Sequence, residues 1–389
     1  MNARSDTPLC IAPLTSAEID AAIHALLARL ARIDAQCGSA FPLYAHGDDD
    51  CWTLSNGGSW VGGFWAASWW RRARLTGDRT DRDKASVLSA RLAAKLDTDS
   101  INRAMLFWYG AAQGAMAFGD PAATHLAYAA ADAIAGSFDA VHGFVPVGVE
   151  LGGGPDAMRR ASVDTLAPLI QLLSYEDVPA SSEIARRHTD ALIAACMTSD
   201  GAWHAEAALT EAVLRPLGTA GSWSRGQAWA MLGLSAAAAR WRGAYLERAL
   251  VSCAYWRRTR PTACPPDRID RADGPVDPSA SLIAALAMLA VAREVDSVDA
   301  ARAGFDSAAA RVAALLRSPH YVRLPDGSAR FVGACCRIAP DSLALVETAW
   351  SHFLLVDALC QLRSMSLQPR FAPAGTGPAP VVSTKESIR

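Results

Sequence analysis

The sequence has little imbalance of charge, no long apolar run and no cluster of basic residues. Its 389 residues carry 37 Lys and Arg against 39 Asp and Glu, a formal net charge of −2, so no basic block is available to neutralise phosphates. The most apolar stretch, residues 282–292 (LIAALAMLAVA), is too short to cross a bilayer and is expected to be a buried helix. We therefore expect neither nucleic acid nor a membrane among the partners.

Metal-ligand and disulfide patterns are missing as well. The nine cysteines are an odd number and include no CxxC pair and no Cys/His ligand spacing, so reduced thiols are the simplest interpretation and no metal is expected. The vicinal pair Cys335-Cys336 could oxidise. The first twenty residues lack the charged start, apolar run and cleavage site of a secretory signal, and a cytoplasmic location is expected.

Helical periodicity is what the sequence does contain. About twelve Ala-rich segments have apolar residues at helical spacing: 21–33, 64–75, 86–96, 104–118, 124–138, 163–175, 181–197, 224–241, 245–259, 279–295, 299–316 and 345–362. Alternating strand patterns are nearly absent, and only residues 320–324 and 329–332 suggest a hairpin around Pro325-Asp326-Gly327. The predicted fold class is all-α.

Gly-Asp pairs recur between these helices. Gly77-Asp78 and Gly119-Asp120 each follow a helix, where Gly adopts the left-handed cap and Asp can cap the next helix. Such recurrence predicts stacked helical hairpins, and six of them closing into a ring would form an (α/α)6 barrel. We expect one domain over residues 1–367 and a disordered C-terminal tail over residues 368–389, which is rich in Pro, Gly and Ala.

Twelve tryptophans are many for one chain, and several cluster near Gly and polar residues. Aromatic faces pack against the C–H face of a sugar ring, so such clusters suit a carbohydrate cleft, although core packing is the alternative. For Trp60, Trp65 and Trp223, which lie next to Gly in expected loops, lining of a cleft is slightly favoured.

Two charged residues begin helices. Arg225 lies in the first turn of the helix over 224–241, where its guanidinium could bind a carboxylate ligand such as a uronic acid, or pair structurally with a nearby acid; from physics alone the two are about even. Asp164 stands just before a long apolar helix, after the Gly-rich loop 152–154. It could be a simple N-cap, or a partly buried acid whose pKa is raised for proton donation.

Taken together, the motifs resemble those of the unsaturated glucuronyl hydrolases, with the unsaturated rhamnogalacturonyl hydrolases as more distant relatives. The resemblance covers roughly residues 50–362 and is most specific in Trp223-x-Arg225-Gly226-Gln227-Ala228-Trp229. The other matching motifs are Trp60-x-x-Gly63-Phe64-Trp65, Leu106-Phe107-Trp108-Tyr109, Val163-Asp164-Thr165-Leu166, Asp200-Gly201 with His204, Asp277 with Ser279-Ala280-Ser281, and Trp350.

The resemblance implies an (α/α)6 barrel and hydrolysis of a Δ4,5-unsaturated uronic acid at the non-reducing end of an oligosaccharide. In that chemistry one Asp, matched by Asp164, protonates C4 of the double bond and helps to activate the water that adds at C5. No metal or organic cofactor is implied, and the partner is a small oligosaccharide or modified sugar. The residues implied to contact it are Trp60, Trp65, His204, Trp223, Arg225, Gln227 and Trp229.

Two positions depart from the family pattern. Asn102 stands where a second catalytic Asp is usual, and an amide keeps the shape of that side chain but not its charge. Trp350-Ser351-His352 replaces Trp-Gly-Asp, and His352 could supply a group that titrates near neutral pH and touches substrate. Three interpretations stay open: an active hydrolase, a diverged hydratase, isomerase or lyase on the same barrel, and a non-catalytic carbohydrate-binding protein.

Overall fold

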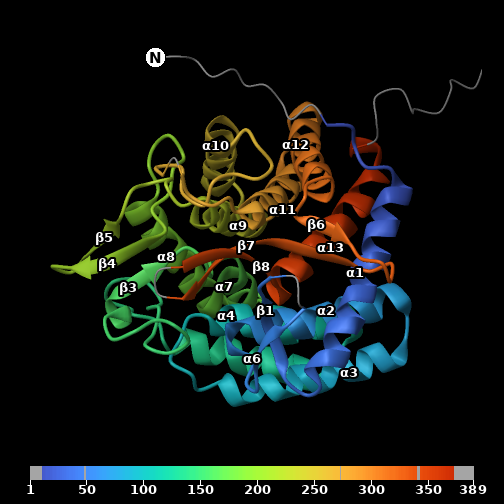
Figure 1. Cartoon of the computed structure of the whole chain (residues 1–389). Helices are drawn as coiled ribbons and strands as arrows, with labels where there is room; N and C mark the ends of the chain where they lie inside the picture. Colours follow the sequence, from blue (N-terminus) through green and yellow to red (C-terminus); the bar gives the residue numbers. More distant parts are fainter. Residues whose placement is uncertain (1–10, 48–49, 272, 340–341, 372–389) are drawn as a thin grey trace, which may run out of the picture.

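The computed structural model describes residues 11–47, 50–271, 273–339 and 342–371. Within them, a π-helical segment over Trp108–Ala112 joins α4 to α5, so the thirteen labelled helices make twelve continuous ones (Figure 1). Their bounds are α1 (Ser16–Cys37), α2 (Gly62–Thr76), α3 (Arg79–Arg91), α4 (Arg103–Phe107), α5 (Gln113–Phe118), α6 (Pro121–Ala135), α7 (Leu166–Leu173), α8 (Pro179–Cys196), α9 (Ser224–Trp241), α10 (Ala244–Thr259), α11 (Pro278–Glu294), α12 (Val298–Leu316) and α13 (Ala349–Ser366). The predicted all-α class with six helical hairpins is confirmed.

Consecutive helices pack as pairs, and one layer of the barrel lies inside the other. Helix α2 packs on α3, α9 on α10 and α11 on α12, while α11 also contacts α9 and α13. Because α11 has neighbours on nearly every side, almost its whole length is buried, as expected for the apolar stretch 282–292. The barrel core is therefore one continuous apolar cluster.

The Gly-Asp turns act as the sequence predicts. Gly77 and Gly119 have φ values of 71° and 57°, the left-handed conformation that ends α2 and α5. Asp78 accepts a hydrogen bond from Thr80 N (2.8 Å), and Asp120 accepts one from Ala123 N (3.0 Å), so each caps the next helix. These caps satisfy amide groups that would otherwise be unpaired at the start of α3 and α6.

The barrel carries more strands than the sequence indicates. A five-stranded antiparallel sheet has the order β2-β1-β8-β7-β6, and a three-stranded one has the order β3-β4-β5. Their bounds are β1 (Phe41–Ala45), β2 (Trp52–Ser55), β3 (Arg160–Ser162), β4 (Glu206–Thr210), β5 (Val213–Leu217), β6 (Tyr321–Arg323), β7 (Ala329–Ala339) and β8 (Ser342–Thr348). The hairpin expected around Pro325-Asp326-Gly327 is present as β6–β7.

The last predicted helix began too early. Residues 345–348 belong to β8, and α13 starts at Ala349, where the Thr348 side chain accepts from Ser351 N (3.1 Å). A run such as Leu-Ala-Leu-Val fits a helical window as well as a strand, and pairing with β7 and β1 decides in favour of the strand.

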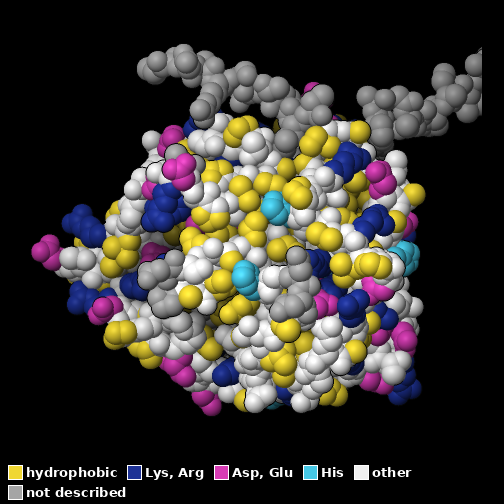
Figure 2. Space-filling view, viewed as in Figure 1, with side chains coloured by type: hydrophobic (Ala, Val, Ile, Leu, Met, Phe, Trp, Pro, Cys, Tyr) yellow, Lys and Arg dark blue, Asp and Glu magenta, His cyan; other side chains and the backbone are white. Residues whose placement is uncertain are grey.

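Strands β7 and β8 form a long hairpin that crosses the face of the barrel seen in Figure 1. On this face hydrophobic side chains gather over the middle, whereas charged side chains lie mainly around the edge (Figure 2). Along the regular part of β7 successive side chains point to opposite sides, and Cys335 is buried while its neighbour Cys336 is partly exposed. Both cysteines are free thiols in the structure.

Buried charge ties this sheet to α1. Arg29, fully buried, donates from Nε to Glu347 Oε1 of β8 (3.0 Å) and from Nη1 to Asp50 Oδ2 (2.9 Å). Glu347 is only 2% exposed. One guanidinium therefore binds carboxylates from two segments and fixes the C-terminal end of β8, which is the open end of the β7–β8 hairpin.

The packed structure reaches beyond the predicted domain boundary at residue 367. A short 3-10 helix over Pro369–Phe371 buries Phe371, which stacks on Phe305 of α12. The rest of the expected tail, residues 372–389, lies outside the described residues. Among the described helices, none combines the length and hydropathy required of a membrane span.

Candidate active site

Asp164 lies in the turn that joins β3 to α7. The turn is fixed from both sides, since Val163 N donates to Ala205 O (3.0 Å) and Asp164 N donates to Ser162 Oγ (3.3 Å). The N-cap position of α7 is Thr165, and Asp164 Oδ1 is a buried atom without a hydrogen-bond partner among the described residues. The N-cap interpretation is therefore wrong, and the carboxyl group is left available for another role.

The surroundings of Asp164 favour its neutral form. Burial raises the pKa of the carboxyl group to about 7, with Glu206 adding to the rise and Arg225 opposing it. The residue keeps a part of its surface exposed, although its Oδ1 atom is buried. An acid that titrates near neutral pH can both donate a proton and accept one back.

Arg225 is already paired. Its Nη1 donates to Asp277 Oδ2 (2.8 Å) and to Cys335 O (3.0 Å), and Asp277 is fully buried. Of the two interpretations of Arg225, the structural ion pair is present. About 16% of the Arg225 side chain remains exposed, and its guanidinium lies over the rings of Trp223 (5.4 Å) and Trp350 (5.6 Å).

The rings of Trp60, Trp229 and Trp350 form an aromatic wall beside this guanidinium. The Trp350 ring lies 6.4 Å from that of Trp60 and 6.2 Å from that of Trp229, so residues from three distant segments meet. Trp223 and Trp60 are partly exposed, and Trp223 Nε1 donates to Asp267 Oδ1 (3.0 Å). Trp350 and Asp267 were absent from the residues expected at the site; Trp350 was visible only as a match in the last helix.

Two of the residues expected at the site are structural. Trp65 is 1% exposed and packs edge-on against Trp69 inside the core, so it lines no cleft. Gln227, also 1% exposed, accepts from Trp203 N (2.8 Å) and donates to Gly201 O (3.0 Å). It fastens α9 to the turn before β4 instead of facing solvent. Trp229 is also nearly buried, at 3% exposed, and its ring packs against that of Trp350.

The two expected histidines differ in their surroundings. His204 is partly exposed. Its Nδ1 lies 3.1 Å from the carbonyl oxygen of Gly218, the residue that follows β5. His352 is 2% exposed, both ring nitrogens lack partners among the described residues, and burial lowers its pKa to about 3. The expectation that His352 titrates near neutral pH is therefore wrong, because the apolar core excludes its charged form.

Asn102 precedes α4 and is partly exposed, and its Nδ2 donates to Leu151 O (3.3 Å) of the Gly-rich loop. This bond holds the loop that leads toward Asp164. The Asn102 side chain carries no charge, since an amide does not titrate.

Solved structures of known proteins share this architecture. An unsaturated glucuronyl hydrolase from Bacillus sp. GL1, described as responsible for glycosaminoglycan degradation, matches with a TM-score of 0.79 and 23% identity over 88% of this chain and 96% of that chain. The fold of this chain is that of the unsaturated glucuronyl hydrolases.

Two further hydrolases of this fold support the match. The enzyme from Streptococcus agalactiae gives a TM-score of 0.78 at 18% identity, over 93% of this chain and 96% of that one. One specific for heparin gives 0.77 at 17% identity, over 90% and 97%. No protein-family model matches the sequence, and the curated proteins contain no sequence match.

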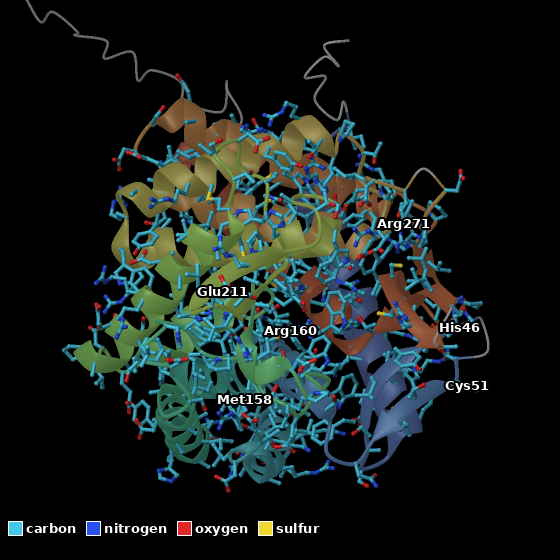
Figure 3. The ribbon with its side chains drawn as sticks, turned by 90° about the vertical axis from the view of Figure 1, so that its left-hand side faces the viewer. His46, Cys51, Met158, Arg160, Glu211 and Arg271 are labelled. Carbon is cyan, nitrogen blue, oxygen red and sulfur yellow. The ribbon has the colours of Figure 1, made fainter. Side chains whose placement is uncertain are left out.

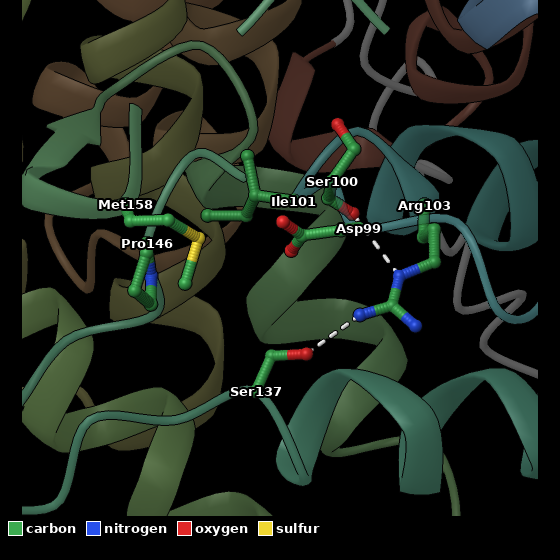
Figure 4. Close-up of a pocket in the computed structure, with 7 residues that line it drawn as sticks. All are labelled: Asp99, Ser100, Ile101, Arg103, Ser137, Pro146 and Met158. Carbon is green, nitrogen blue, oxygen red and sulfur yellow. Dashed lines mark hydrogen bonds between the residues drawn. The ribbon is translucent and has the colours of Figure 1, made fainter. Parts of the chain in front are cut away.

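A small cavity lies beside the turn that contains Asn102. It has about 110 Å³ and is lined by Asp99, Ser100, Ile101, Arg103, Ser137, Pro146 and Met158 (Figure 4). Arg103 is buried and donates from Nε to Ser100 O (3.1 Å) and from Nη2 to Ser137 Oγ (2.7 Å). Pockets for drug-sized ligands measure about 300–1,000 Å³, so this one is too small for a disaccharide.

A larger hollow of about 330 Å³ lies between the outer helices α8 and α10 and is lined in part by Ile193, Glu247 and Val251. Neither hollow is lined by Asp164. The acid instead interacts electrostatically with Arg225, whose guanidinium lies over the rings of Trp223 and Trp350. In the described ranges, no group of three or more His, Cys, Asp or Glu side chains is placed to hold a metal ion.

Replacing Asp164 with Asn is expected to stabilise the fold, and increasingly so at higher pH. The pKa of Asp164 is raised in the folded state, so folded protein binds this proton more tightly than unfolded protein and loses stability as pH rises from about 4 to about 7. Asn removes that loss. After discounting for partial exposure, we expect the variant to gain about 2 kcal/mol at pH 8 and almost nothing near pH 4. Urea unfolding at both pH values measures the difference, and a gain independent of pH would contradict the raised pKa.

Proposed function

We propose that the chain hydrolyses a Δ4,5-unsaturated uronyl or closely related sugar at the non-reducing end of an oligosaccharide, with Asp164 as the acid and base. The observation that carries the proposal is the Asp164 carboxyl group, which has one buried unpartnered oxygen and a pKa of about 7 and interacts with Arg225, whose guanidinium lies over the rings of Trp223 and Trp350. The shared fold supports the same conclusion, because solved structures of that fold include a complex with dGlcA-GalNAc6S.

The proposed reaction balances with one carboxyl group. The O–H of protonated Asp164 gives its proton to C4 of the double bond, and the electron-poor C5 then takes the oxygen of a water molecule. That water returns a proton to the Asp164 carboxylate, so the acid is regenerated. The product carries a hydroxyl group on C5 next to the ring oxygen, a hemiketal that opens and releases the rest of the oligosaccharide.

The residues around Asp164 have separate roles in this proposal. The partly exposed faces of Trp60 and Trp223 would stack on the sugar ring. Arg225, although paired with Asp277, would direct its exposed part toward polar groups of the sugar. His204 would contact a hydroxyl group, and Asn102 would hold a hydrogen bond but carry no charge.

Asn102 favours a second candidate, in which the cleft binds a carbohydrate without hydrolysing it. An amide cannot stabilise a developing positive charge or share a proton, so the step at C5 would be slow. The two candidates make opposite predictions for a single substrate mixture.

The test is an assay of the purified protein with unsaturated uronyl disaccharides prepared by polysaccharide lyases. The ultraviolet absorbance of the C4=C5 bond is expected to fall with time and with enzyme concentration. Stable absorbance together with heat of binding in calorimetry would identify the binding protein. Stable absorbance with no heat would reject both candidates for these sugars.

A further inference from the structure

A second acid approaches Asp164 from the neighbouring strand. In the antiparallel pair β3–β4, Ser162 lies opposite Glu206, and the hydrogen bond from Val163 N to Ala205 O (3.0 Å) continues the pairing to the residue before Asp164. Residues directly opposite each other in such a pair put their side chains on the same face of the sheet. Glu206 is therefore held next to the turn that carries Asp164.

Glu206 is held in place by the guanidinium of Arg160, which lies on the same face of the β3–β4 pair. Arg160, two residues before Ser162 on β3, forms an ion pair and hydrogen bond with Glu206 Oε2 through Nη2. The side chains of the pair are 31% and 35% exposed, so neither is buried enough for the pair to serve core stability. Figure 3 shows Arg160 on the side of the molecule that carries this sheet.

The charges near Asp164 come from three elements. Glu206 of β4 is the like charge, Arg225 of α9 is the opposite charge, and Arg160 of β3 acts through Glu206. The titratable groups that act on Arg225 in turn are Asp277, Asp267 and Cys336. The partly exposed His204 lies two residues before Glu206, and its Nδ1 faces the carbonyls of Leu217 and Gly218. Glu206 is thus the negative charge that offsets part of the effect of the Arg225 guanidinium on the acid.

We propose that Glu206, held against β3 by Arg160, is a positioning residue that adds to the effect of burial in favouring the protonated carboxyl group of Asp164 at neutral pH. Burial is the main reason that the proton is held, and Glu206 offsets part of the opposing effect of Arg225, so without Glu206 a larger share of Asp164 would be the carboxylate, which has no proton to give. The role deepens the proposed function, on which it rests for the use of that proton, but the protonation itself can be measured without a substrate.

The experiment measures the titration of Asp164 by carbon-13 NMR of protein labelled at the aspartate side-chain carboxyl groups, with Asp164→Asn used to assign the signal. In Glu206→Gln the midpoint is expected to move to lower pH by about half a unit or more, because a like charge is lost. Glu211→Gln is the matched control: Glu211 is an exposed residue in the β4–β5 turn, and the midpoint is expected to stay in place.

Arg160→Gln gives the opposite sign. Removing the guanidinium leaves the charge of Glu206 uncompensated, so the Asp164 midpoint is expected to rise. A midpoint that does not move in Glu206→Gln overturns the proposal, and one that falls or stays in Arg160→Gln removes Arg160 from it. Circular dichroism checks that each variant is folded.

The same variants separate this inference from the proposed function. If unsaturated uronides are turned over, the alkaline limb of the pH–rate profile should move with the NMR midpoint in Glu206→Gln. If the midpoint moves while no uronide is turned over, the positioning role stands and the proposed reaction fails. If turnover persists with an unmoved midpoint, the reaction stands and the role of Glu206 fails.

Discussion

Asp164→Asn should lower the rate of hydrolysis of an unsaturated uronyl disaccharide by about 10³-fold, within the range for loss of a general acid and base. The amide has nearly the shape of the carboxyl group but can neither protonate C4 nor accept the proton of the attacking water. The loss of ultraviolet absorbance measures the rate. Substrate affinity should change much less, because the aromatic wall and Arg225 are untouched.

The pH profile of the unmodified protein gives an independent check. Since the acid must be protonated to act, activity should be high below about pH 7 and fall as Asp164 ionises above it. If the stability of the variant at pH 8 is raised as expected, unfolding is excluded as the cause of its inactivity. An Asp164→Asn variant that keeps a tenth or more of the activity would remove Asp164 from the mechanism.

The sequence predicts the barrel because its signals are local. A helix is fixed by residues three and four apart, and a Gly-Asp turn such as Gly77-Asp78 fixes the end of one helix and the cap of the next. Both can be read in a short window. The strands β1 and β8 also pair with each other across about 300 residues of sequence, as in the pairing of Ala45 with Glu347, and no short window contains that contact.

The identity of the site residues was also predictable where it depended on local sequence, and not where it depended on contacts between distant segments. Asp164 was identifiable because it matches a motif and lies just before a helix, but the burial of its unpartnered Oδ1 atom depends on tertiary packing that the sequence does not show. Trp65 and Gln227 sit in matching motifs, yet one fills the core and the other fastens a turn. A residue in a matching motif can therefore be required for packing and not for catalysis.

The paired state of Arg225 shows why charge is hard to place from sequence. Its partner Asp277 comes from the start of α11, and the carbonyl that completes the pairing comes from Cys335 of β7. Three segments must fold before the guanidinium is neutralised. The β7–β8 hairpin therefore helps to place the Arg225 guanidinium through the carbonyl of Cys335.

Arg29→Met is expected to destabilise the fold by about 3–5 kcal/mol, the cost of leaving a buried carboxylate without its partner. Arg29 is fully buried and neutralises Glu347, which is 2% exposed at the open end of the β7–β8 hairpin. Urea unfolding followed by circular dichroism measures the change. The loss should be greater at high pH, because Glu347 can escape part of the penalty by taking up a proton at low pH.

Arg32→Met is the matched control on the same helix. The Arg32 side chain is 43% exposed and pairs with Asp50 and Asp326 at the surface, so the expected loss is at most about 1 kcal/mol. Equal losses in the two variants would mean that burial of the Arg29 network contributes nothing specific. The thiol of Cys336 on β7 reports on the hairpin. If Arg29→Met makes Cys336 react faster with thiol reagents while Arg32→Met does not, the Arg29 network holds the β7–β8 hairpin in place beside Arg225.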